Sequence, residues 1–355
     1  MAKVIVGMSG GVDSAVAAYL LKKQGYEVIG VTLRTWTSQE GEESRCCEID
    51  DARRIADRIG IGYRTLNCEQ AFRQSVIEPF VREYVSGKTP NPCVICNRRV
   101  KWEWMTYLAG VLQADYVATG HYASIVKLEN GRYTVKRASS KKDQAYMLYR
   151  LSQEQLSRTL LPLSDLTKDE VRAIAEEAQL PVAHKKDSQE ICFIPDNDHA
   201  KFILSEEGQK ESVAGNFVDA DGNILGTHNG IIHYTIGQRK RLGLSLGHPV
   251  FVKEIRPETN EVVIALDEAE IMSSEIEVTD LHFQGIPDIL PGEPVRANVK
   301  VRYHHEGENA LIERISPEKV RICFDQPVRA AAPGQSAVFY DENECVIGGG
   351  IITQN

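Results

Sequence analysis

The sequence has no long apolar stretch. None of its runs approaches the roughly 18 apolar residues that a membrane helix needs, so we expect no membrane-spanning segment. The opening stretch, MAKVIVGMSGG, contains an apolar run too short for a signal peptide, and glycines interrupt it. Internal repeats and low-complexity segments are also missing. For a chain of 355 residues these absences predict a cytoplasmic globular protein of about two or three domains.

The chain also has no excess of positive charge. Its formal net charge is −9, which argues against a globally basic nucleic-acid-binding protein. Local basic runs are nevertheless present at 98–101, 136–142 and 239–241. A solvated surface is the commoner role of any single run, but RNA binding needs only a local patch. The composition therefore leaves RNA binding open.

The eight cysteines have no secreted context that would favour disulfides. In a large cytosolic chain thiols stay reduced, and close spacing indicates metal binding or catalysis. Cys93 and Cys96 form a Cys-x-x-Cys pair that follows two prolines, in what we expect to be a loop. Inert burial is the expected role of Cys68, Cys323 and Cys345.

Strand and helix patterns alternate in the first half of the chain. We expect strands at 3–7, 28–33, 63–66 and 116–119 and helices at 12–24, 47–59, 69–85 and 98–112. This order predicts an α/β fold with a parallel sheet covered on both faces. A hairpin is expected at 123–137, and a capping box of Thr167 and Glu170 begins a further helix.

Helical periodicity nearly disappears after about residue 212. Short strand patterns separated by turns replace it up to residue 351. We therefore expect a small central domain followed by an all-β barrel or sandwich.

The stretch GMSGGVDS lies between the first expected strand and helix. Its glycines let backbone N–H groups approach an anion, and the helix N-terminus favours negative charge. It lacks the lysine of a Walker A motif. The alternative is a tight turn capped by Asp13 or Ser14. The candidate nucleotide-binding residues are Gly7, Met8, Ser9, Gly10, Gly11, Val12, Asp13 and Ser14.

This stretch resembles the phosphate loop of the ATP pyrophosphatases, which adenylate an acceptor while releasing pyrophosphate. Further motifs resemble those of the tRNA-specific 2-thiouridylases: TPNPCVICN at 89–97, ATGHYA at 118–123, KDQAYML at 142–148, DSQEICFI at 187–194, YTIGQRKRLGL at 234–244, VRYHH at 301–305 and PGQSAVFY at 333–340. The resemblance implies three domains: an ATP-binding catalytic domain at 1–198, a tRNA-contacting central domain at 199–272 and a β-barrel at 273–355. It also implies 2-thiouridine formation at the wobble position of tRNAs for lysine, glutamate and glutamine.

The resemblance implies further site residues and ligands. ATP with Mg²⁺ is the expected cosubstrate, contacted by Leu33 and Gly120 as well as the phosphate loop. The segment beside the target base matches Asn91, Pro92 and Cys93. Positions matching tRNA contacts are His121, Lys142, Asp143, Gln144, Arg302, Tyr303 and Gln335. Generic surface polarity is the alternative for each of these.

Cys96 and Cys192 match the two reactive cysteines of the 2-thiouridylases. In one form of the reaction Cys192 carries a persulfide and Cys96 acts as nucleophile or disulfide partner. Many relatives carry aspartate at the position of Cys93, so this chain has three candidate thiolates. Three thiolates suit a 4Fe-4S cluster with one open iron that accepts inorganic sulfide, and this is the preferred hypothesis. Alternatives are the persulfide pair, a zinc site, a Cys93–Cys96 redox pair or simple packing.

Three cations near these thiols, Arg98, Arg99 and Lys185, are expected to favour a thiolate. The sulfur source, either a donor protein or inorganic sulfide, stays open, as does the role of Cys46 and Cys47. Two rival functions remain: another adenylating synthetase, and a non-catalytic RNA-binding protein with a structural metal. ATP cleavage that depends on tRNA would separate the first rival from a 2-thiouridylase.

Overall fold

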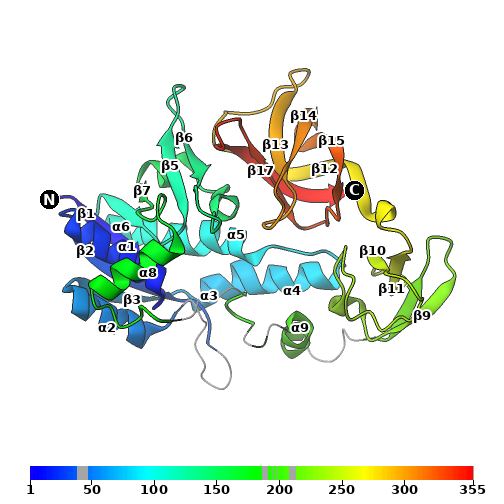
Figure 1. The fold of residues 1–355 in the computed structure, drawn as a ribbon, viewed down its shortest axis with the longest axis horizontal. Coiled ribbons are helices and arrows are strands. Elements are labelled where there is room, and N and C mark those ends of the chain that lie inside the picture. The colour runs from blue at the N-terminus through cyan, green and yellow to red at the C-terminus, as the bar shows by residue number, and fades with distance from the viewer. Residues whose placement is uncertain (38–46, 186–190, 195, 197, 208–212, 355) are drawn as a thin grey trace.

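The computed structural model describes residues 1–37, 47–185, 191–194, 196, 198–207 and 213–354. Its N-terminal domain is built on a five-stranded parallel sheet of order β3-β2-β1-β4-β7 (Figure 1). The strands are β1 (Lys3–Gly7), β2 (Glu27–Arg34), β3 (Gly62–Asn67), β4 (Tyr116–Ala118) and β7 (Thr159–Leu160).

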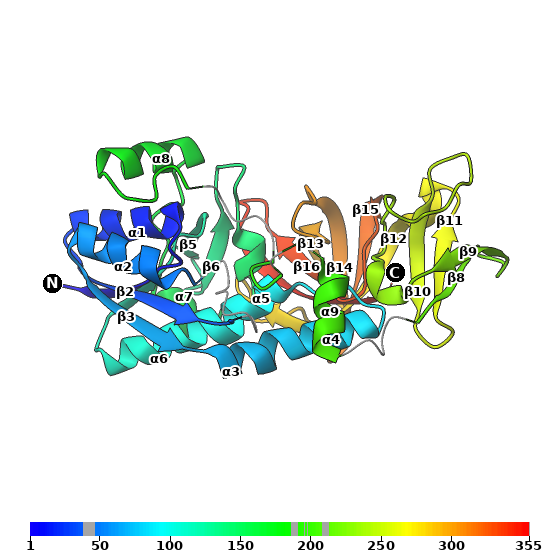
Figure 2. The same cartoon turned by 90° about the horizontal axis from the view of Figure 1, so that it is seen from below.

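Successive side chains of β1 point to opposite faces of the sheet, so the core of this domain has two layers. Val4 and Val6 pack with α1 (Val12–Lys23), α2 (Ile49–Ile59) and α8 (Lys168–Glu177), whereas Ile5 faces the opposite layer. Figure 2 shows α1, α2 and α8 on one side of the sheet and α3 and α6 on the other. The predicted doubly covered parallel sheet is therefore confirmed.

A long helical run leaves the sheet and reaches the central domain (Figure 1). It joins α3 (Glu69–Phe72), the π-helical turn η1 (Arg73–Ile77) and α4 (Glu78–Val85). Pro79 lies in the first turn of α4 and has no N–H for an α-helical bond, which gives the preceding π-helical turn a physical reason. The run covers the same residues as the predicted helix at 69–85.

The expected loop around the cysteine pair is wrong. Residues Pro92–Cys96 form helix α5, which continues through the π-helical turn η2 (Asn97–Trp102) into α6 (Glu103–Val111). Pro92 is the first residue of α5, a position at which proline is favoured because its missing N–H would have no partner in the helix. Cys93 and Cys96 therefore lie on successive turns of one rigid element.

The hairpin predicted at 123–137 is present as β5 (Ala123–Lys127) and β6 (Tyr133–Arg137). Short helical elements follow: η3 (Ala145–Leu148) and α7 (Gln153–Ser157). Arg132 of this hairpin donates hydrogen bonds to the carbonyl oxygens of Gln284 (2.7 Å) and Phe283 (3.1 Å) in the C-terminal domain. The hairpin thereby joins the N-terminal domain to the barrel.

The central domain holds a four-stranded sheet of order β10-β11-β8-β9. Its elements are α9 (His199–Glu207), β8 (Gly215–Val218), β9 (Ile224–His228), η5 (Ile231–His233), β10 (Phe251–Arg256), β11 (Glu261–Ala265) and η6 (Glu268–Ile271).

The C-terminal domain is a closed barrel, in agreement with the predicted β-architecture. Its strands are β12 (Met272–Phe283), β13 (Val295–Lys300), β14 (Glu308–Ser316), β15 (Lys319–Arg329), β16 (Ser336–Tyr340) and β17 (Val346–Gln354).

Candidate active site

The phosphate loop occupies the carboxyl end of the parallel sheet. Gly10 has a φ of 80°, and a Cβ there would lie 2.8 Å from the Cβ and carbonyl oxygen of Glu48, so only glycine fits. Gly11 is the N-cap residue of α1 and has no side chain with which to cap the helix. The first N–H groups of α1 are therefore suited to an anion.

The serine hydroxyls hold the loop in shape. The N–H of Ser9 donates to Ser14 Oγ (3.2 Å), Ser14 Oγ donates to the Gly11 carbonyl (3.1 Å), and the N–H of Gly11 donates to Ser9 Oγ (3.3 Å). Neither Ser14 nor Asp13 is the N-cap residue. A side-chain cap by either residue is therefore absent at the start of α1, while the Ser14 hydroxyl bridges the turn before it.

The Asp13 carboxylate bonds to two partners from outside the loop. Lys168 Nζ donates to both oxygens, at 2.8 and 2.9 Å, and the hydroxyl of Tyr122 donates to Oδ1 at 2.7 Å. Lys168 is the first residue of α8 and follows the Thr167 cap. Sequence reasoning used this capping box only to locate a helix and missed both partners of Asp13.

The two other predicted ATP contacts lie close to the loop or in the core. A Cβ on Gly120 would be 2.7 Å from the Asp13 carbonyl carbon and 2.8 Å from the Ser14 nitrogen, so the chain after β4 packs directly on the loop backbone. Leu33 is buried at the end of β2. Met8 and Val12, which flank the loop glycines, are buried as well. A role for Leu33 at the adenine stays a prediction.

Helix α5 is capped by a residue that was predicted to contact the target base. Asn91 Oδ1 accepts hydrogen bonds from the N–H groups of Cys93 (3.1 Å) and Val94 (3.4 Å), and Pro92 is the first helical residue. Cys93 is partly exposed, whereas Cys96, one turn later, is buried. The two thiols of the pair thus have different surroundings.

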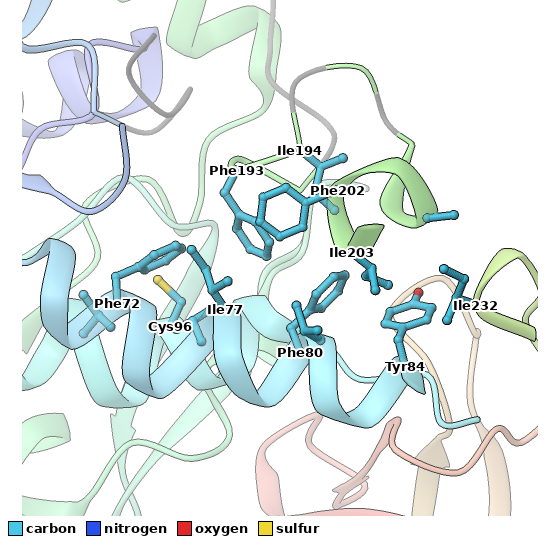
Figure 3. Packing of buried hydrophobic residues seen from close by; sticks show 14 of the residues in the cluster. Phe72, Ile77, Phe80, Tyr84, Cys96, Phe193, Ile194, Phe202, Ile203 and Ile232 are labelled. Atoms are coloured by element: carbon cyan, nitrogen blue, oxygen red, sulfur yellow. The ribbon is translucent and has the colours of Figure 1, made fainter. Parts of the chain in front are cut away.

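Cys96 belongs to the apolar cluster between the sheet and the central domain. Figure 3 shows its sulfur beside Phe72 and Ile77 on the long helical run. Phe193, next to Cys192 in the chain, packs edge-on against Phe72 with ring centroids 5.5 Å apart. Cys192 itself is partly buried against the same cluster. The structure therefore brings Cys96 and Cys192 to one apolar cluster.

The three cysteines do not form a recognisable metal site. Across the described ranges of the chain, no group of three histidine, cysteine, aspartate or glutamate side chains is placed to hold a metal ion. Within these ranges Cys93, Cys96 and Cys192 therefore do not form a site for a single ion such as zinc. Cys46 and residues 186–190 lie outside the described residues, so the role of Cys46 stays open.

Two of the three cations expected to favour a thiolate, Lys185 and Arg99, pair with carboxylates instead. Lys185 Nζ bonds to Glu48, to Asp51 Oδ2 at 2.5 Å and to the Gly10 carbonyl at 3.3 Å. Arg99 pairs with Glu103 at the surface of the helical run. The charge of Lys185 is compensated by two carboxylates, so its contacts stabilise the phosphate loop instead of a thiolate.

His121 is held beside the catalytic domain core. Its Nδ1 shares a hydrogen bond with Thr119 Oγ1 (2.8 Å), and its ring lies 5.6 Å from that of Trp102. Burial, with a smaller effect from Lys101, lowers the pKa of His121 to about 3. The imidazole is therefore neutral at physiological pH and suited to hydrogen bonding, not to ion pairing with phosphate.

The barrel reaches the cysteine helix through Tyr303. Its hydroxyl donates to the Asp143 carbonyl (3.0 Å), and burial, Asp143 and Cys93 all raise its pKa. The Asp143 carboxylate accepts from the N–H groups of Ala138 (3.0 Å) and Ala145 (3.1 Å). Asp143 thus braces its own segment, and a tRNA contact through its carboxylate is not apparent from these bonds.

The other predicted tRNA contacts divide into internal and accessible groups. Gln144 Oε1 accepts from the Tyr122 N–H (3.0 Å), and Gln335 donates to the Thr89 carbonyl (2.9 Å), just before the cysteine helix. Lys142 and Arg302 are partly exposed. Burial and Arg329 lower the pKa of Arg302. These two cations are the members of the set best placed to meet a phosphate.

Comparisons with known proteins decide the family. The family described as tRNA methyl transferase HUP domain matches residues 2–196, and the associated PRC-barrel domain and aminomethyltransferase β-barrel domain match 201–266 and 273–352. A tRNA-specific 2-thiouridylase of Lachnoclostridium phytofermentans is 51% identical over 99% of both chains. Another, from Acetivibrio thermocellus, is 50% identical over 99% of both. The chain belongs to the tRNA-specific 2-thiouridylase family. It is thus a tRNA sulfurtransferase with the nucleotide-binding loop of the ATP pyrophosphatases.

One solved structure is a distant match to this 2-thiouridylase family member. The U34-tRNA thiolase NcsA from Methanococcus maripaludis with its 4Fe-4S cluster is 21% identical, covers 58% of this chain and 67% of that one, and has a TM-score of 0.36. That score supports no argument about chemistry. In the part of the chain that the structure describes, no helix is long and apolar enough to span a bilayer.

Proposed function

We propose that this 2-thiouridylase acts on the wobble uridine of tRNAs for lysine, glutamate and glutamine. The proposal rests on an anion site and a cysteine-bearing helix that lie in the same domain. A glycine-lined anion site stands at the start of α1, and a cysteine-bearing helix, α5, faces the barrel through Tyr303. The first part suits ATP activation and the second suits attack by sulfur.

The first step is adenylation of the uracil C2 oxygen. The oxygen attacks the α-phosphorus of ATP, and pyrophosphate leaves from the phosphate loop. The loop supplies N–H donors from Gly10 and the start of α1, which stabilise charge on the leaving group. Magnesium fits this site as a partner of the nucleotide phosphates, because Mg²⁺ is commonly held by phosphates with few protein ligands.

The second step replaces the activated oxygen by sulfur. A persulfide on Cys192 attacks C2 through its terminal sulfur, and AMP leaves with the C2 oxygen. The Cys96 thiolate then attacks the Cys192 sulfur, which forms a Cys96–Cys192 disulfide and releases the 2-thiouridine. An external thiol reductant and a sulfur-donor protein complete the cycle. The shared packing of Cys96 and Cys192 supports this pairing.

The 4Fe-4S hypothesis needs Cys93, Cys96 and Cys192 at one metal. Cys93 and Cys96 would hold it from α5, and Cys192 from the apolar cluster that also contains Cys96. Such a cluster would accept inorganic sulfide at an open iron and so spare the cysteines from redox chemistry. Iron and acid-labile sulfide content after oxygen-free purification tests it directly.

Substitution of Cys93 distinguishes the two sulfur routes. In the persulfide route Cys93→Asp keeps near-normal thiolation, since only Cys96 and Cys192 exchange sulfur. In the cluster route it lowers iron content and thiolation together, because aspartate is a poorer ligand for a soft cluster. Thiolated nucleosides are measured by mass spectrometry with inorganic sulfide in one assay and a persulfide donor in another. Cys192→Ala, inactive in both routes, is the matched control.

Dependence on tRNA tests the reaction as a whole. We expect AMP and pyrophosphate to form only when an unmodified substrate tRNA is present. Equal ATP cleavage without tRNA would instead indicate a synthetase with a small-molecule acceptor and would overturn the proposal.

A further inference from the structure

The phosphate loop contains a carboxylate where a polyphosphate should bind. Asp13 lies in the first turn of α1, two residues after Gly11. An acidic residue there interacts favourably with the helix dipole. The same position, however, places a negative charge beside the anion that the loop is built to accept, and like charges at such short range repel. A cation that pairs with Asp13 would offset this charge and so favour phosphate binding.

Lys168 is placed to provide that offset. Its ammonium bonds to both carboxylate oxygens of Asp13, and its side chain is 14% exposed. Partial burial makes the pair less screened than a surface ion pair. Tyr122 adds a neutral hydrogen bond to the same carboxylate. The pair therefore has close to zero net charge at the mouth of the loop.

The position of Lys168 is fixed independently of Asp13. Thr167 caps α8 in a reciprocal capping box with Glu170. Buried Val171 and Ala175 anchor α8 in the same apolar layer as α1. Helix packing thus delivers the ammonium to the loop from a segment 155 residues away in the chain.

We propose that Lys168 is a positioning residue for nucleotide binding, which neutralises Asp13 so that the loop accepts the pyrophosphate moiety of ATP. The proposal rests on the proposed ATP-binding role of this loop. Lys168 acts through Asp13 and not by touching the phosphate. A lysine that only docked α8 onto α1 would affect stability but not the preference of the loop for an anion.

Binding of inorganic pyrophosphate to the full chain, measured by calorimetry, tests the proposal. Lys168→Met should weaken binding roughly ten- to hundred-fold, the range expected when a charge-assisted hydrogen bond is lost beside an unpaired carboxylate. Lys168→Arg keeps the charge and should stay within about three-fold of the unmodified chain. Tyr122→Phe removes a neutral hydrogen bond only, and we expect a smaller loss than for Lys168→Met.

The deciding measurement repeats Lys168→Met in an Asp13→Asn background. There the substitution should change pyrophosphate affinity by less than about three-fold, because no negative charge remains to be offset. This double variant also leaves no unpaired charge, so it guards against a misfolded Lys168→Met protein. An equal loss in both backgrounds would show that Lys168 binds the phosphate itself and would overturn the proposal. No loss in either background would leave Lys168 a docking residue, which also overturns it. Failure of the unmodified chain to bind pyrophosphate would instead refute the ATP role of the loop.

Discussion

Gly120 provides a sharp test of how the phosphate loop is supported. A methyl group at this position would lie 2.7 Å from the Asp13 carbonyl carbon and 2.9 Å from its oxygen. Both contacts are with backbone, which cannot rotate away as a side chain can. To restore ordinary contact at 3.4 Å, the loop must move by about 0.7 Å. Gly120→Ala therefore displaces the N–H groups that face the nucleotide.

The size of the effect follows from hydrogen-bond geometry. Bonds of about 2.9 Å do not survive a displacement of this size, and each charged one contributes about 1.5–3 kcal/mol. We expect ATP affinity, measured by calorimetry, to fall at least about ten-fold, while filter-binding affinity for tRNA stays unchanged. Gly110→Ala is the matched control: it lies in α6 with no atom within 4 Å of the added methyl. It should stabilise the helix by about 1 kcal/mol and leave ATP binding intact. A folded Gly120→Ala protein that binds ATP normally would refute this account of the loop.

Three further predictions concern the surroundings of the loop and of α5. Burial lowers the pKa of His121 to about 3 from 6.5, so its contribution to stability is complete above pH 6.5 and is lost as the pH falls toward 3; an NMR titration in which this histidine protonates near 6.5 would contradict the burial. Asn91→Ala should destabilise the protein by about 1 kcal/mol in chemical denaturation through loss of the α5 cap, whereas Asn91→Asp, which preserves the cap, should not. Lys142→Glu or Arg302→Glu should weaken tRNA binding and reduce the slope of log affinity against log salt concentration by roughly one phosphate contact. The exposed residue Lys23 supplies the control Lys23→Glu, for which we expect no change in slope. If both variants kept the slope of this control, neither residue would lie in the RNA interface.

The parts predicted well from the sequence are those encoded locally. The glycines and hydroxyls of the phosphate loop, the capping box at Thr167 and the hairpin near Gly131 each need only neighbouring residues to form. The helix at 69–85 was also predicted, because its apolar pattern runs through the π-helical turn without interruption. Local signals failed at Asn91-Pro92, where a helix start was interpreted as a loop.

The partners of Asp13 could not be predicted for a different reason. Tyr122 and Lys168 are 109 and 155 residues away from it in the chain. No spacing rule links residues so far apart, and only the packing of α8 on α1 and the end of β4 against the loop brings them together. An ordinary lysine at the start of a helix has no sequence signal that would distinguish it from a solvated one.

The cysteines show how packing separates residues that the sequence groups together. Cys93 and Cys96 look like one unit because they are three residues apart, yet Cys93 is partly exposed near Tyr303 and Cys96 is buried beside Phe72 and Ile77. Cys192, almost a hundred residues later, packs on the same apolar cluster as Cys96. A pair that exchanges sulfur needs only those two thiols to meet, whereas a cluster needs all three within reach of one metal. In the persulfide route Cys93 is therefore the cysteine whose replacement the reaction should tolerate best.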